Sequence, residues 1–239
     1  FFVLKGRWRF FWGRWGTAGE VVLEEGDIIN IPTGIFRGFE NIGSNYGMIM
    51  AILGGDDAGG GVTWAPQVIQ DAAEHGLILG ENGRLYDSKK GETLPENLKP
   101  MPLLSKDFLA QVPEPKAKNL VPRYVARYND LMAFAAHEPI QVIGEKGILP
   151  DKPGFNIDFL TRSPILEVPE SFENSAVLMP MRGHWKLSWE GGNVVLNPGD
   201  TCLLEPGFSH RIEPSVTGEA SLYRILSNED PAGPTWVDD

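Results

Sequence analysis

The stretch Gly6-Arg7-Trp8-Arg9-Phe10-Phe11-Trp12 has a counterpart far downstream, Gly183-His184-Trp185-Lys186-Leu187-Ser188-Trp189. Both run glycine, basic residue, Trp, basic residue, apolar residue, any residue, Trp. Large apolar and basic side chains alternate with period two, which is typical of a β-strand with one buried face. The pattern predicts tryptophans that point inward and basic side chains that point to solvent.

A second pair of matching stretches follows the two heptapeptides. Val21-Val22-Leu23-Glu24-Glu25-Gly26-Asp27 corresponds to Val194-Val195-Leu196-Asn197-Pro198-Gly199-Asp200. Each leads through a short apolar run to a glycine, Gly34 or Gly207, and then to a further apolar strand. Short strands joined by Gly and Pro turns favour a sandwich or a small barrel. The sequence therefore predicts a mainly β fold that contains one β unit twice.

The segment between the two copies differs in character. Residues 54–61 are rich in Gly and Asp, Pro66 is placed to begin a helix that runs through His75, and Ser105 is placed to cap a second short helix. We therefore divide the chain into an N-terminal β unit at 1–56, a partly helical linker at 57–138 and a C-terminal β unit at 139–239. The first unit opens within an apolar strand, so we expect its first strands to lie upstream.

Composition limits which binding partners and which cellular compartment we expect. The 239 residues carry a formal net charge of −11, which disfavours nucleic acid and anionic membrane surfaces, because both recruit basic faces. No apolar run reaches the roughly 20 residues that a membrane-spanning helix needs. The single cysteine, Cys202, excludes an intrachain disulfide. It favours a reducing compartment, so we expect a cytoplasmic protein.

One spaced motif in the first copy points to a family. Gly26 is followed after five residues by Pro32, then by Gly34, after two residues by Arg37 and after three by Asn41. This resembles the second sequence signature of the cupin superfamily, which has a histidine where Arg37 stands. The remaining positions of the signature match.

The second copy matches a different subset of the positions of the same signature. Gly199, Gly207 and His210 match it, while Glu205 and Pro214 replace its proline and asparagine. The resemblance covers both β units but not the linker. It implies two cupin-type β-barrels, which are double-stranded β-helices of jelly-roll topology.

The first cupin signature supplies most of the metal ligands of the family, two histidines and one glutamate. Alignment of its last glycine with Gly183 places Ala176 at the glutamate position and the histidine positions near Glu170 and Phe172. His210 and Glu170 are therefore the candidate metal ligands, with Glu173 as an alternative to Glu170. In the first copy the corresponding positions fall before residue 1. The resemblance implies a bound divalent metal, with iron the first choice. Because the candidate ligands are so few, a protein without a metal is the alternative.

Three further residues are candidates for substrate binding. An arginine cannot ligate a metal because it stays protonated, but Arg37 could pair bidentately with a substrate carboxylate. The alternative is an internal ion pair with a nearby acid such as Glu40. Trp8 and Trp185 could line an aromatic binding cavity, and the alternative is that such tryptophan rows simply pack as core.

These residues leave three hypotheses about function. The segments 31–37 and 51–55 are similar to the N-terminal part of homogentisate dioxygenases, which implies a dioxygenase that acts on a small aromatic or carboxylate substrate. The second hypothesis is a metal-free cupin that binds a small ligand or has a structural role. The third is a metal-dependent isomerase or lyase. By analogy with cupins that pair through edge strands, we expect a homodimer.

Overall fold

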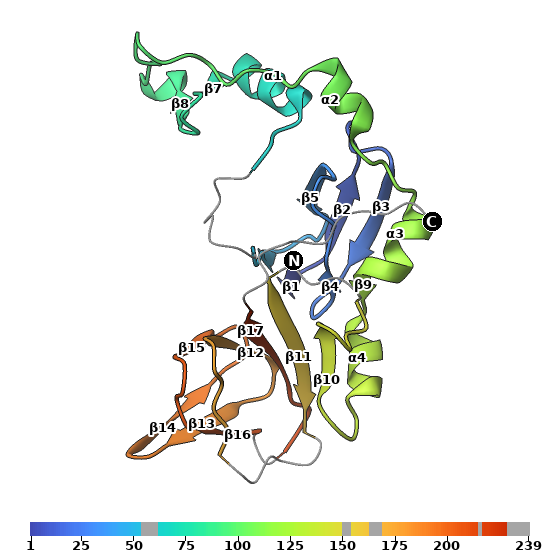
Figure 1. The fold of residues 1–239 in the computed structure, drawn as a ribbon, viewed down its shortest axis with the longest axis vertical. Helices are drawn as coiled ribbons and strands as arrows, with labels where there is room; N and C mark the ends of the chain where they lie inside the picture. Colours follow the sequence, from blue (N-terminus) through green and yellow to red (C-terminus); the bar gives the residue numbers. More distant parts are fainter. Residues whose placement is uncertain (54–61, 150–153, 163–168, 215–216, 229–239) are drawn as a thin grey trace.

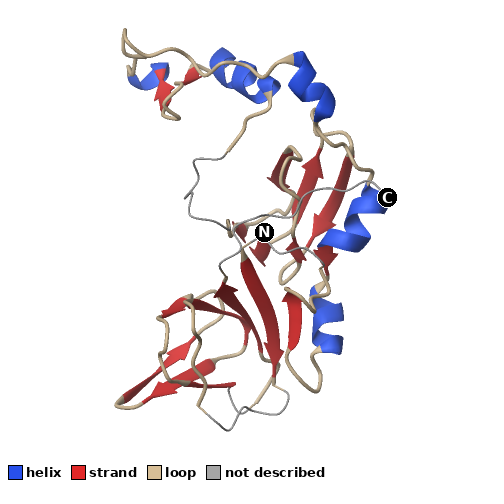
Figure 2. Ribbon diagram, viewed as in Figure 1, coloured by secondary structure: helices blue, strands red, loops and turns tan. Residues whose placement is uncertain are grey.

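The computed structural model describes residues 1–53, 62–149, 154–162, 169–214 and 217–228. The chain is mainly β, as the alternating patterns predicted, and the helices of the described residues lie in the middle of the chain (Figure 2). Two β units lie one above the other in Figure 1, and they are called the first half and the second half below.

The first half consists of two sheets. One has the order β6-β1-β4-β9 and the other the order β3-β2-β5. In β2 the alternation predicted from the sequence is clear: Phe10 and Trp12 are buried, whereas Arg9 pairs on the outer face with Glu20 and Glu40. The strands are β1 (Phe2–Lys5), β2 (Trp8–Trp12), β3 (Gly19–Leu23), β4 (Ile28–Ile29), β5 (Arg37–Asn41), β6 (Met48–Met50) and β9 (Val125–Ala126).

The second half repeats this plan with a larger sheet. Its sheets have the orders β10-β11-β17-β12-β15 and β14-β13-β16. The strands are β10 (Ile140–Ile143), β11 (Phe155–Thr161), β12 (Ala176–Arg182), β13 (Trp185–Trp189), β14 (Gly192–Leu196), β15 (Cys202–Leu204), β16 (Arg211–Pro214) and β17 (Ser221–Ser227).

The strand orders of the two halves correspond. The order β6-β1-β4 in the first half matches β17-β12-β15 in the second, and β3-β2-β5 matches β14-β13-β16. The sequence repeat is therefore a repeat of topology. The expected jelly-roll fold is confirmed: in the described residues each half consists of two separate sheets that pack through their side chains, and strand pairing does not join them into a closed barrel.

The middle of the chain forms an arm and two supporting helices. The expected helices are present as α1 (Pro66–Glu74) and α2 (Lys106–Gln111), and the Ser105 hydroxyl accepts a hydrogen bond from the Phe108 amide at 3.1 Å. With β7 (Leu77–Leu79), β8 (Leu85–Asp87) and η1 (Ser88–Lys90), they extend away from the sheets (Figure 1). Helices α3 (Ala117–Tyr124) and α4 (Tyr128–Phe134) then return along the sheets, and β9 between them pairs with β4.

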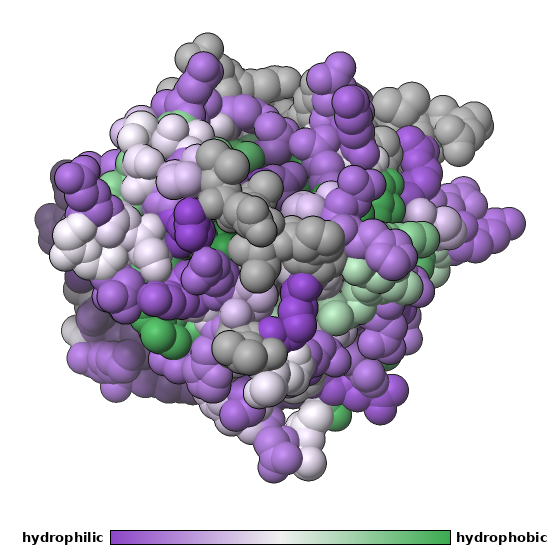
Figure 3. Space-filling view, turned by 90° about the horizontal axis from the view of Figure 1, so that it is seen from below, coloured by the Kyte–Doolittle hydropathy of each residue, from purple (hydrophilic) through white to green (hydrophobic). Residues whose placement is uncertain are grey.

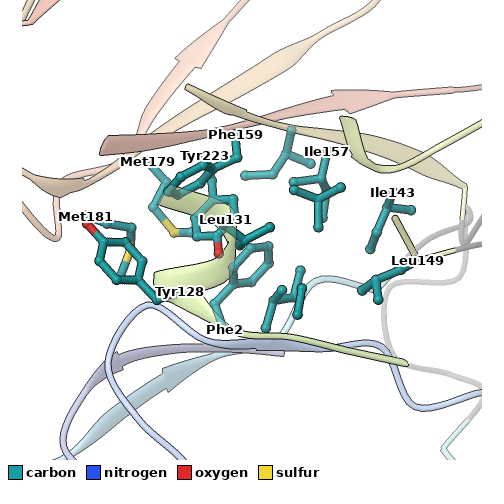
Figure 4. Close-up of a cluster of buried hydrophobic side chains, with 14 of the residues drawn as sticks. Phe2, Tyr128, Leu131, Ile143, Leu149, Ile157, Phe159, Met179, Met181 and Tyr223 are labelled. Carbon is teal, nitrogen blue, oxygen red and sulfur yellow. The ribbon is translucent and has the colours of Figure 1, made fainter. Parts of the chain in front are cut away.

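A shared core joins the two halves. Phe2 and Ile28 of the first half pack with Tyr128 and Leu131 of α4 and with the outer face of the large sheet of the second half, where Tyr223 lies (Figure 4). Separate cores fill the interior of each half. The buried surface between the halves makes the two copies one packed body.

One face of the molecule is mostly polar. The face shown in Figure 3 is mostly hydrophilic, and its hydrophobic side chains form small separate patches. Within the described ranges, no helix is both long enough and apolar enough to cross a membrane.

Candidate functional site

The register of the sheets places the two signature positions at equivalent points. Trp12 of β2 lies opposite Arg37 of β5. In the second half β13 pairs with β16 from Trp185 to Ser188, and continuing that register by one residue puts Trp189 opposite His210. Arg37 and His210 are therefore structural counterparts, as the aligned sequence signatures predicted.

His210 lies in the interior of the second half. Its side chain has 0% exposure, and its Nδ1 lies 2.9 Å from the carbonyl oxygen of Phe208. A carbonyl only accepts hydrogen bonds, so in the neutral ring the proton sits on Nδ1 and the lone pair on Nε2. That buried Nε2 has no hydrogen-bond partner. His210 therefore presents the unshared lone pair of Nε2 to the interior.

Glu170 is held beside His210 by the backbone. The amide of each residue donates to the carbonyl of the other, at 2.8 and 2.9 Å, which forms an isolated antiparallel bridge. The Oε1 atom of Glu170 lies 3.7 Å from His210 Nε2. The structure thus brings together the two residues that the sequence proposed as metal ligands.

The Glu170 carboxylate already has a cationic partner that the sequence did not indicate. The Nη1 atom of Arg224 donates to both of its oxygens, at 3.1 and 2.9 Å. Arg224 also donates from Nε and Nη2 to Asp158 Oδ2, at 3.1 and 2.8 Å. No sequence spacing signals this trio, because its members come from β11, β17 and the segment before β12.

The cupin resemblance implies a metal centre, and the donors near His210 can be compared with what such a centre needs. Cupin metal centres use several imidazoles and a carboxylate that converge on one point and leave positions open. Within the described residues, no group of three or more His, Cys, Asp or Glu side chains is placed to hold a metal ion. His210 supplies one donor, and Arg224 occupies both oxygens of Glu170. The residues present therefore do not fit the metal centre, and Glu173 adds no donor to it.

Arg37 has a different environment in the first half. Its Nη1 donates to the carbonyl oxygens of Ile31 and Pro32, at 2.9 and 3.2 Å. The alternative ion pair with Glu40 is not formed, because Glu40 projects from the other face of β5, where its carboxylate lies 2.7 Å from Nη2 of Arg9. Within the described residues, Nε and Nη2 of Arg37 have no hydrogen-bond partner. The residue is exposed as a whole, although burial lowers the pKa of its guanidinium, which remains charged at neutral pH.

The ring of Phe1 lies next to Arg37 and belongs to a cluster of four aromatic rings. Phe39 stands two residues along β5 on the same side of the sheet, and its ring lies 5.9 to 6.1 Å from the rings of Phe1, Trp8 and Phe10. The Arg37 guanidinium lies 5.8 Å from the centre of the Phe1 ring. We call Arg37, Phe39, Phe1 and Trp8 the Arg37 face.

The Arg37 face is open, whereas its counterpart in the second half is closed. Phe39 lies opposite Phe10, as Ile212 lies opposite Leu187 in the second half. Phe39 is 48% exposed and Ile212 only 4%. The difference follows from sheet size, since two further strands, β11 and then β10, extend the sheet beyond β17, while its counterpart β6 pairs only with β1 in the described residues.

The two candidate tryptophans differ in accessibility. The Trp8 indole donates to the Lys5 carbonyl at 3.0 Å, and its half-buried ring is part of the Arg37 face. Trp185 is 2% exposed, and its indole donates to the carbonyls of Arg182 and Ser221 at 3.2 Å each. Trp8 can therefore contact a ligand, while Trp185 packs as core in this structure.

Comparisons with known proteins give partial structural likenesses only. No protein-family model matches the chain, and no curated protein matches it. A cupin-2 domain protein from Shewanella frigidimarina matches with a TM-score of 0.35 and 14% identity, over 43% of this chain and 94% of that one.

Two further solved structures also match this chain only in part and with low TM-scores. A cupin superfamily protein from Desulfitobacterium hafniense matches with a TM-score of 0.31 and 12% identity, over 38% of this chain and 79% of its own. A DMSP lyase from Ruegeria pomeroyi matches with a TM-score of 0.33 and 15% identity, over 38% of this chain and 46% of its own. At these values the matches carry no argument about chemistry, and the jelly-roll assignment rests on the strand orders described above.

Proposed function

We propose that this chain is a two-copy cupin protein that binds a small aromatic carboxylate on the Arg37 face of its first half, without a metal. One observation carries the proposal. The Nε and Nη2 edge of Arg37 has no protein partner in the described residues, and the Phe1 ring beside its guanidinium packs against the 48% exposed Phe39.

The chemistry of the face matches this class of ligand. The free edge of a guanidinium offers two parallel N–H donors, which is the geometry that a carboxylate accepts bidentately. The carbonyls of Ile31 and Pro32 fix the opposite corner of the guanidinium, so little side-chain entropy remains to be lost on binding. Phe39 and Trp8 supply ring faces and edges for an aromatic group.

Metal-dependent chemistry is the rival function. A dioxygenase, isomerase or lyase of the cupin type needs a metal, for which the second half offers His210 with a Glu170 already paired to Arg224. Because this donor set does not fit a metal centre, ligand recognition in the first half, with no metal-dependent reaction step, is the function that the residues support best.

Titration calorimetry with benzoate and phenylacetate tests the proposal. We expect saturable binding by the whole chain and none of the matched neutral amides. Arg37→Gln should weaken binding by roughly 10- to 100-fold, which corresponds to the loss of a charge-assisted hydrogen-bond pair. Arg9→Gln is the matched control, because Arg9 lies on the outer face of the same sheet and should leave the affinity unchanged.

Two results would overturn the assignment. Equal affinity of the Arg37→Gln and Arg9→Gln variants would remove Arg37 from the site. Ligand affinity that rises when the protein is diluted would show that a second copy of the chain covers this face, and the Arg37 face would then be a dimer contact.

A further inference from the structure

A segment of the linker covers the inner face of the first half where β3 forms the edge of its sheet. Trp12 and Val21 lie at this edge and are 0% and 9% exposed. The Trp12 indole donates to the Pro115 carbonyl, just before α3. Leu120 of α3 packs with both side chains in one core. A short helix from elsewhere in the chain therefore buries this edge.

The equivalent edge of the second half has no such cover among the described residues. Trp189 is the counterpart of Trp12, and the strand registers make Val194 the counterpart of Val21. Trp189 and Val194 are 37% and 40% exposed. The ring of the half-buried Phe208 lies 6.0 Å from that of Trp189. We call Trp189, Val194 and Phe208 the β14 patch, an apolar surface without the helix that protects its counterpart.

The arm, residues 62–112, has exposed apolar side chains and no core of its own. Tyr86 is its one buried side chain, and none of its residues belongs to the three cores. Its helices α1 and α2 have nine and six residues, too few to be stable alone in water. Six large apolar side chains of the arm are 46–55% exposed, namely Val62, Trp64, Val68, Leu85, Leu103 and Phe108. The arm therefore needs a further surface to pack on.

The arm and the β14 patch of one chain lie too far apart to meet. They are at opposite ends of the longest axis of the molecule, with the first half between them (Figure 1). A second copy that runs in the opposite direction brings each arm beside the β14 patch of the other chain. Such a two-fold arrangement contains the contact twice, and the arm is longer than the roughly 20–30 residues that one side of a standard interface uses.

We propose that the chain forms a homodimer by exchange of arms, in which the arm of each copy packs its exposed apolar side chains on the β14 patch of the other. A helix of the arm then takes the place that α3 has in the first half. Burial of apolar surface on both sides drives the association. The Arg37 face lies in the other half, on β5 at the opposite edge of the corresponding sheet, so the inference does not depend on ligand binding there.

Sedimentation velocity of the whole chain over a series of concentrations tests the proposal. Val194→Asp places a charge in the β14 patch. Val195→Asp is the matched control, because Val195 is 51% exposed on the outer face of the same strand. The double variant Val68→Ser with Phe108→Ser, called the arm variant, removes exposed apolar side chains from α1 and α2. Circular dichroism and urea unfolding verify that each protein is folded.

We expect the native chain to be a dimer that dissociates on dilution. Val194→Asp and the arm variant should each weaken one contact about 10-fold, and the dimer, which contains two contacts, roughly 100-fold. Val195→Asp should sediment as the native chain. A mixture of Val194→Asp with the arm variant should form more dimer than either alone, because one intact arm then meets one intact patch.

Three results would overturn the exchange of arms. The first is a native chain that sediments as a monomer at every concentration up to about 100 µM, which requires no variant to fold. The second is equal weakening by Val194→Asp and Val195→Asp, which would remove the β14 patch from the contact. The third is a mixture that forms no more dimer than its separate components, which would show that the arm and the patch do not bind each other.

Discussion

The hydroxyl of Tyr223 donates a hydrogen bond to the carbonyl oxygen of Gly26 at 2.7 Å, across 197 positions of sequence. Tyr223 lies on β17 of the second half, and Gly26 lies in the turn between β3 and β4 of the first. Glu25 in the same turn pairs with Arg182. Figure 4 shows Tyr223 beside Phe2 and Tyr128 in the shared core. This turn is therefore the polar centre of the contact between the halves.

Gly26→Ala should destabilise the protein far more than Gly199→Ala. Both glycines have a left-handed backbone, with φ of +93° and +89°, so alanine costs about 1–2 kcal/mol at either site. A Cβ at Gly26 would lie 2.3 Å from the Tyr128 ring, whereas a Cβ at Gly199 meets nothing within 4 Å. Overpacking adds about 1–3 kcal/mol at Gly26 only. Equal urea midpoints for the two variants would contradict this packing argument.

Asp27→Asn should cost about 2–3 kcal/mol of unfolding free energy, through weakened charge-assisted hydrogen bonds. The buried Asp27 carboxylate accepts from Arg127 Nη1 and from the amides of Tyr128 and Glu24, at 2.8, 2.8 and 3.0 Å. Among the described residues, its repeat counterpart Asp200 accepts side-chain hydrogen bonds only from Asn197, and it is exposed. Asp200→Asn is therefore the matched control, with an expected change below about 0.5 kcal/mol by chemical denaturation.

The protein should lose stability at alkaline pH through Tyr128. Burial raises the pKa of Tyr128 from 10.0 to about 12, although its hydrogen bond with Ser221 acts in the opposite direction. A raised pKa in the folded state means that the contribution is complete below pH ~10 and is lost as the pH rises towards ~12. Urea midpoints measured from neutral pH upward should fall in this window.

Tyr128→Phe should reduce that alkaline decrease without abolishing it. Burial also raises the pKa of Tyr223 well above its usual value, so the second tyrosine maintains part of the effect. Phenolate absorbance, followed alongside unfolding, identifies the titrating groups. An unchanged pH dependence in Tyr128→Phe would assign the effect to other groups.

Trp12→Phe should destabilise the first half by about 1–3 kcal/mol. The fully buried Trp12 indole donates to the Pro115 carbonyl at 2.7 Å and fixes the returning linker against β2. Trp189 holds the same position in the repeat but is 37% exposed, so Trp189→Phe should change stability by less than about 1 kcal/mol. Thermal or urea unfolding of the two variants checks the difference. Similar losses of stability in both would show that the contact between Trp12 and the linker does not stabilise the first half.

Local sequence determined the repeated β architecture. The alternation in Gly6–Trp12 and Gly183–Trp189 predicted strands, and the glycines at 26, 34, 199 and 207 all adopt positive φ, which few residues other than glycine tolerate. These signals act over two to seven residues. They were sufficient to predict strands and turns in both copies, whereas the jelly-roll topology followed only from the resemblance to cupins.

Tertiary structure alone decided which copy of the signature is open and which is filled. Phe39 and Ile212 occupy equivalent positions, yet in the described residues only the second half has β11 and β10 extending its sheet beyond β17. The alignment found His210 and Glu170, but Arg224 lies 54 positions from Glu170 and 66 from Asp158. No spacing rule connects such residues. The strand register brings them together, and the cost of leaving charges unpaired in a poorly solvated interior makes their contact decisive.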